Sequence, residues 1–111
     1  MYLENLSKGL KEVRELNKEA PIYFLGLFNP FSKAFGDIPE IDGIVKEWNE
    51  GSKEIASQYH DVTFVPIADI FLDTEENLLY KDAFHPNDEG YDLMGNRVVY
   101  YLKENKVVVN Q

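Results

Sequence analysis

Apolar residues recur at spacings of three and four near the start of the chain, with charged residues between them. They are Leu3, Leu6, Leu10, Val13 and Leu16. This spacing predicts an amphipathic helix of about four to five turns. The helix should end by Ala20-Pro21, because a proline disfavours helical geometry in the residue before it.

Two short stretches, Ile22–Leu27 and Val62–Val65, are apolar without alternation. Such runs predict strands buried on both faces, as in a parallel sheet covered by helices. A second helix is expected between them, since apolar residues and one serine share a helical face. They are Ile41, Val45, Trp48, Ser52, Ile55 and Tyr59. Gly51 weakens the middle of this helix by roughly 1 kcal/mol relative to alanine, which predicts a break or kink.

The last third of the chain is expected to begin with an irregular segment, Ile67–Leu79, and to end with a helix after Pro86. Asn87 is a favourable N-cap, and the acids Asp88 and Glu89 suit the positive end of the helix dipole. The buried face of this helix is predicted to hold Tyr91, Met94, Val98 and Tyr101 or Leu102.

The alternation of helices with fully apolar strands predicts an α/β fold with parallel strands. Two strands are fewer than such a sheet normally contains. We therefore expect residues 1–111 to form a single partial domain, the second half of a doubly wound fold with an incomplete sheet.

The composition excludes several function classes. Asp and Glu outnumber Lys and Arg by 20 to 11, and the net charge of −9 disfavours phosphate backbones and anionic membranes. The chain has no cysteine, which rules out disulfides, thiolate catalysis and zinc–thiolate sites. No spaced Asp/Asn loop of the calcium-binding type, signal peptide or apolar run of about 20 residues is evident. We expect no nucleic-acid partner and no membrane segment in this chain.

The candidate chemistry lies between the last strand and the last helix, where Asp82 precedes His85 by three residues. Functional groups of α/β sheets gather outside the carboxyl ends of the strands. A carboxylate at this spacing can accept the Nδ1 proton of the imidazole and leave Nε2 free as a base. Pro86 restricts His85 to an extended backbone. The competing interpretation is a chance pair of exposed side chains; the other histidine, His60, is expected to be an ordinary surface residue.

The segment Asp82-Ala83-Phe84-His85-Pro86-Asn87, followed by Gly90-Tyr91, resembles the last conserved block of the SGNH (GDSL-like) hydrolases. Residues 20–31 and 44–49 resemble a Gram-positive bacterial lipase/acylhydrolase subgroup of this family. The resemblance implies a flavodoxin-like three-layer αβα fold. It covers essentially the whole chain, but only the carboxyl-terminal half of the family's domain.

By this resemblance, Asp82 is the orienting acid and His85 the general base of a Ser-His-Asp triad in an esterase, lipase or acylhydrolase. No Gly-Asp-Ser motif occurs in the chain, and the motifs that supply the oxyanion hole have no match. The chain is thus expected to be one part of a serine ester hydrolase, inactive or nearly so by itself. No cofactor or metal is implied. Localisation is not readable, although the resemblance suggests a parent protein exported from or tethered to the cell.

The loop after the first strand is rich in phenylalanine, and such a loop either packs on the body of the protein or lines a site. Side chains expected to form a wall of the substrate pocket are Phe28, Asn29, Phe31 and Phe84. A metal-dependent hydrolase is a further alternative, but Asp82, Asp88 and Asp92 divide between a loop and a helix.

The unpaired edge of the Ile22–Leu27 strand predicts association, because an open apolar edge is a template for another strand. The expected partner is the missing amino-terminal half or a second copy of the chain. The alternative function is a non-catalytic acidic α/β module that binds a protein through this edge or through the phenylalanine-rich loop.

Overall fold

The computed structural model describes residues 2–30, 39–72, 77–81 and 85–105. These residues form helices and strands in the order expected, with one additional short helix. The elements are α1 (Tyr2–Leu16), β1 (Ile22–Leu25), α2 (Pro39–Ser57), β2 (Val62–Val65), α3 (Ala68–Leu72) and α4 (Asp88–Glu104).

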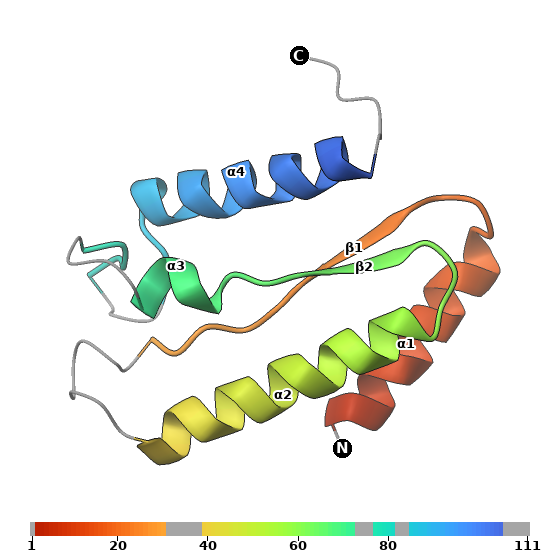
Figure 1. Cartoon of the computed structure of the whole chain (residues 1–111), viewed down its shortest axis with the longest axis horizontal. Coiled ribbons are helices and arrows are strands. Elements are labelled where there is room, and N and C mark those ends of the chain that lie inside the picture. Colours follow the sequence, from red (N-terminus) through yellow and green to blue (C-terminus); the bar gives the residue numbers. More distant parts are fainter. Residues whose placement is uncertain (1, 31–38, 73–76, 82–84, 106–111) are drawn as a thin grey trace.

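The two strands pair in parallel, with Ile22 opposite Val62 and Leu25 opposite Val65. Helices α1 and α2 lie on one side of the strands and α4 lies on the other (Figure 1). This layered arrangement confirms the predicted α/β class with parallel strands. The backbone groups of Tyr23 point away from β2, because those of Ile22 point toward it and alternate residues face opposite edges.

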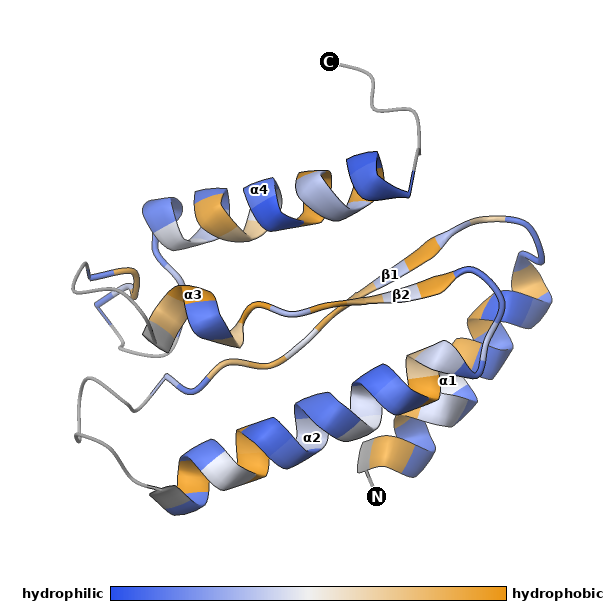
Figure 2. Cartoon of the chain, viewed as in Figure 1, coloured by the Kyte–Doolittle hydropathy of each residue, from blue (hydrophilic) through white to orange (hydrophobic). Residues whose placement is uncertain are grey.

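The core lies toward the carboxyl end of the sheet. The strands are apolar to neutral, whereas the long helices mix apolar and hydrophilic positions (Figure 2). Val65 at the end of β2 is fully buried, and the buried side chains Ile67, Phe71 and Leu78 follow it in the chain. The segment that was expected to be irregular therefore supplies three of the six buried apolar side chains among the described residues, and part of it is α3.

Helix α2 is continuous through Gly51 and runs straight along its length (Figure 1), so the predicted break or kink is wrong. A Cβ at Gly51 would lie 2.7 Å from Leu3 Cδ1, which shows that α1 packs closely on α2 at this glycine. Beside this contact, Ser7 Oγ and Tyr59 Oη are 2.9 Å apart. Gly51 serves helix packing rather than helix bending.

At the amino end of the sheet, Arg14 near the end of α1 joins the connections that lead into the two strands. Its guanidinium donates to the carbonyls of Asn17 and Ala20 after α1 and to those of His60 and Asp61 before β2. Asp61 has a positive φ of 57° in this turn. One side chain thus ties together both connections that enter the strands.

Helix α4 begins as predicted, with Asn87 as its N-cap. Its buried face is narrower than expected: Met94 and Val98 are half-buried, but Tyr91 is 53% exposed, so its predicted burial is wrong. Near its end, Asn105 Nδ2 donates to Tyr23 Oη and Thr63 Oγ1, both at 3.1 Å. The carboxyl-terminal end of α4 is therefore fastened to both strands. None of the described helices is long and apolar enough to cross a membrane.

Candidate active site

His85 lies on a hairpin-like loop that leads into α4. Leu79 and Pro86 form an antiparallel bridge, and Tyr80 N donates to the carbonyl of His85 at 2.7 Å. His85 itself is exposed, at the carboxyl end of the sheet as expected. Asp82 and Phe84 lie outside the described residues, so the predicted Asp82–His85 contact stays a prediction.

Asn87 joins the two sides of this loop. Its backbone N–H donates to the carbonyl of Leu78 at 2.7 Å. Its side-chain Oδ1 accepts from the N–H of Gly90 at 2.9 Å, while Nδ2 donates to the carbonyl of Asn77 at 2.7 Å. The helix cap and the loop are thus held by one residue.

Gly90 allows the first turn of α4 to lie directly on the loop. A Cβ at this position would be 2.6 Å from the carbonyl oxygen of Leu78, 3.0 Å from Pro86 Cβ and 3.4 Å from Phe71 Cε1. The first of these distances leaves no room for a methyl group, since the obstacle is backbone. A side chain at position 90 would therefore push the loop that bears His85 away from α4.

The segment after β1 reaches the same end of the sheet. The ring of Phe28 stacks on the ring of Phe71 from α3, with centroids 4.1 Å apart and an interplanar angle of 19°. Because Phe71 also lies against Gly90, an apolar contact connects Phe28 with the first turn of α4. The sequence suggested that this loop either packs on the body of the protein or lines a site. The stacking of Phe28 on Phe71 corresponds to the first of these roles.

Asn29 is buried, with 3% of its surface exposed, and its Nδ2 donates to Asp42 Oδ1 at 2.6 Å. Its amide therefore helps to fix the segment after β1 against α2. Phe31, the other residue expected to line the pocket from this loop, lies outside the described residues.

Asn49 of α2 forms hydrogen bonds with the backbone of the same segment. Its Oδ1 accepts from the N–H of Leu27 at 2.7 Å, and its Nδ2 donates to the carbonyl of Leu27 at 2.9 Å. The amide occupies both backbone groups of Leu27, as a neighbouring strand would. The pairing edge expected over Ile22–Leu27 is therefore shorter, since its last residue is already bonded. A cavity of about 370 Å³ lies beside this amide and is also lined by Asn29 and Asp42.

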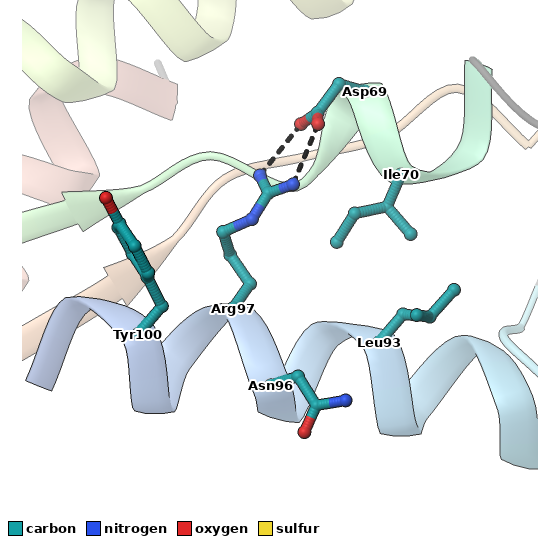
Figure 3. A pocket seen from close by; sticks show the side chains of 6 residues that line it. All are labelled: Asp69, Ile70, Leu93, Asn96, Arg97 and Tyr100. Atoms are coloured by element: carbon teal, nitrogen blue, oxygen red, sulfur yellow. Dashed lines mark hydrogen bonds and ion pairs between the residues drawn. The ribbon is translucent and has the colours of Figure 1, made fainter. Parts of the chain in front are cut away.

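Helix α3 is joined to α4 by an ion pair. The guanidinium of Arg97 donates to both carboxylate oxygens of Asp69, at 2.9 and 2.8 Å, and to the carbonyl of Pro66 at 2.8 Å. Figure 3 shows the two side chains bonded to each other beside a hollow that they line together with Ile70 and Leu93. The hydrogen bond from Arg97 lowers the pKa of Asp69 below its ordinary value, and Asp69 raises that of Arg97. This pair fixes α4 to the end of β2.

In the parts of the chain that the structure describes, no group of three or more His, Asp or Glu side chains could hold a metal ion. The described portion of the site offers a histidine, amides and aromatic rings.

Sequence patterns missed three residues of this region, Asn49, Phe71 and Asn77. Phe71 lies in a helix of five residues, which is too short for periodicity to reveal. Asn49 acts through a contact with the backbone of another segment, and such a contact leaves no local pattern. Asn77 contributes its backbone carbonyl, which accepts from Asn87 Nδ2 and which no side-chain pattern reveals. The spacing of Asn87 and Gly90 after His85 was the available signal for the loop.

Comparison with known proteins gives the context of this site. Residues 1–93 match the GDSL-like lipase/acylhydrolase family. The protein YpmR of Bacillus subtilis (strain 168), itself uncharacterized, is 33% identical over 106 residues, which are 93% of this chain and 41% of YpmR.

A solved structure described as a candidate platelet activating factor from Streptococcus pneumonia superposes with a TM-score of 0.70 at 22% identity. The match covers 90% of this chain and 50% of that chain, so this chain spans half or less of the length of both proteins. The likeness in structure shows a shared fold, and the family match extends over the Asp82–His85 block. The chain therefore belongs to the GDSL-like lipase/acylhydrolase family.

Proposed function

We propose that this chain carries the acid and the base, Asp82 and His85, of a Ser-His-Asp triad in an ester hydrolase. The observation that carries the proposal is the family match over residues 1–93, which includes both residues. The exposed position of His85 on a bonded loop at the carboxyl end of the sheet supports it.

In the proposed mechanism, Asp82 accepts the Nδ1 proton of His85 and holds the imidazole in one orientation. Nε2 of His85 takes the proton of an attacking serine hydroxyl and gives it to the departing alcohol as the ester bond breaks, which leaves an acyl-enzyme. His85 then takes a proton from water, whose oxygen attacks the acyl-enzyme, and returns that proton to the serine oxygen as the acid leaves. The serine and the oxyanion-hole donors come from a segment outside the printed sequence, which contains no Gly-Asp-Ser motif.

The substrate is proposed to be an ester whose acyl part lies near the end of β1. Phe28, Phe31 and Phe84 would supply an apolar wall, with Asn29 beside them. The burial of Asn29 and its bond to Asp42 favour a role in shaping this wall.

We further propose that residues 1–111 are the carboxyl-terminal part of an SGNH-type domain, and that β1 pairs with a strand of its remaining part. Among the described residues only β2 pairs with β1, and Tyr23 and Leu25 direct their backbone groups to the other edge. A second copy of the chain is the competing occupant. Light scattering distinguishes them, since a concentration-dependent dimer of the pure chain would favour the second copy.

The first test is hydrolysis of a short-chain nitrophenyl ester by the pure chain. We expect no turnover above background, because nucleophile and oxyanion donors are both costly to lose. Turnover that vanishes in His85→Ala would show that the chain is a complete catalyst and overturn the proposal.

The second test examines the dyad itself by proton NMR. An imidazole Nδ1–H bonded to a carboxylate gives a resonance far downfield of the amide protons. We expect one such resonance, present in wild type and in the control His60→Gln but absent from His85→Ala and Asp82→Asn. A resonance that persists in Asp82→Asn would remove the acid from its proposed role.

A further inference from the structure

We propose that Asn87 is a positioning residue for His85, in addition to capping α4. Its amide locks the loop that bears His85 onto the first turn of the helix. The inference deepens the proposed function, since it rests on His85 acting as the base.

The partners of the Asn87 amide fix its orientation. The N–H of Gly90 can only donate, so the atom facing it at 2.9 Å must be the oxygen. The carbonyls of Asn77 and Leu79 can only accept, so Nδ2 faces them, at 2.7 and 3.4 Å. The side chain thus bridges two segments that are separated by the loop through His85.

Helix capping alone does not require asparagine at this position. Asp and Ser cap helices about as well, because each offers an oxygen to the N–H groups of the first turn. An ionised aspartate has no donor, and a serine hydroxyl has one short donor. Asparagine combines the capping oxygen with two N–H donors, and the carbonyls of Asn77 and Leu79 use those donors. The contacts with the loop, rather than helix capping, therefore explain why residue 87 is an asparagine.

The bonds of Asn87 bear directly on the backbone of His85. The carbonyl of His85 accepts a hydrogen bond from Tyr80 N. This bond and the bonds of Asn87 join the same two backbone segments, residues 77–80 and residues 85–87. If residues 77–80 separate from residues 85–87, His85 loses this partner. A displacement of about 1 Å is enough to lower the rate of a positioned catalyst about a hundredfold.

The test uses two substitutions that keep the cap. Asn87→Asp retains the oxygen for Gly90 but places a second carboxylate oxygen against the carbonyls of Asn77 and Leu79. Asn87→Ser retains the cap and removes the amide donors without adding charge. Asn96→Asp is the matched control, since it adds the same charge to an exposed position of α4.

In Asn87→Asp we expect hydrogen exchange at the Tyr80 amide to be about tenfold faster, the Gly90 amide to stay protected, and the His85 Nδ1–H resonance to broaden. In Asn87→Ser we expect the same changes, with exchange about threefold faster. Asn96→Asp should match wild type. If Asn87→Asp does not fold, Asn87→Ser decides the question.

Unchanged Tyr80 exchange in both variants, with Gly90 protected, would reduce Asn87 to a helix cap. Faster Tyr80 exchange with an unchanged His85 resonance would show that Asn87 holds the loop without positioning the imidazole, which also overturns the proposal. A wild-type chain without any Asp82-dependent resonance would refute the triad instead, and Tyr80 exchange would still report whether Asn87 holds the loop.

Discussion

At the amino end of the sheet a guanidinium gathers backbone carbonyls from two connections, whereas at the carboxyl end asparagine amides pair with both N–H and C=O groups. Arg14 only donates, so it can join segments that present carbonyls. Asn49 and Asn87 donate and accept, so each can take the place of a backbone neighbour. The first arrangement fastens the fold, and the second shapes the loops where the candidate site lies.

The largest loss of stability is expected from Gly90→Ala at the carboxyl end of the sheet. The added methyl group would meet the carbonyl of Leu78, and overpacking of this kind destabilises by about 1–3 kcal/mol. The matched control is Gly95→Ala in the same helix, where nothing lies within 4 Å of the added Cβ. The control should stabilise by about 1 kcal/mol. Urea denaturation measures both, and equal stabilities would contradict the close contact at Gly90.

A somewhat smaller effect is expected from Arg14→Met at the amino end. The substitution keeps most of the aliphatic stem but leaves four carbonyls without their donor, which should cost about 2 kcal/mol. Arg14→Lys should recover part of the loss, because an ammonium can reach fewer of the carbonyls. If the two ends are independent, the His85 resonance stays unchanged in a folded Arg14→Met chain. Its loss would show that the amino end also holds the site.

Asn105→Ala should lower the free energy of unfolding by about 1 kcal/mol, because the Asn105 amide donates to two hydroxyl groups at the amino end of the sheet. The matched control is Asn96→Ala on the exposed face of α4, which should stay within about 0.5 kcal/mol of wild type. A double-mutant cycle with Tyr23→Phe isolates the bond to Tyr23. Additive losses in that cycle would mean that the bond contributes nothing.

The smallest effect concerns the ion pair between Asp69 and Arg97. Asp69 is half-exposed, so we expect the pair to contribute less than about 1 kcal/mol and to weaken in salt. Arg97 lowers the pKa of Asp69 in the folded state, so this contribution is present above the unfolded pKa and disappears as the pH falls below about 4. Asp69→Asn should flatten that part of the stability profile. Arg14 bonds carbonyls that do not titrate, so the Arg14→Met loss should not change over the same pH range.

Local patterns in the sequence predicted α1, both strands and the capped start of α4. Each prediction depended on residues within one element: spacing for the helices, continuous apolar runs for the strands, and Asn87 before two acids for the cap. The family prediction is confirmed by the match over residues 1–93. The pairing of Asp82 with His85 remains a prediction.

The errors came from contacts between elements. Gly51 was expected to bend α2, but the close approach of Leu3 uses the space that glycine leaves. Tyr91 was expected in the core, but α4 has one covered face and Tyr91 lies beside it. For Gly51 a neighbour absent from the local pattern decided the role of the residue, and for Tyr91 the width of the covered face decided it.

By itself, the sequence determined the class of fold and the place of His85 after the last strand, because hydrophobic periodicity and capping act over a few residues. Tertiary structure alone decided how that loop is held. Asn77 and Leu78 meet Asn87 only when residues 77–80 fold back against residues 85–87. Arg14 likewise finds its carbonyls only when two distant connections lie side by side. The physical reason is that a hydrogen bond depends on distance and direction in space, and the order of residues specifies neither across separate elements.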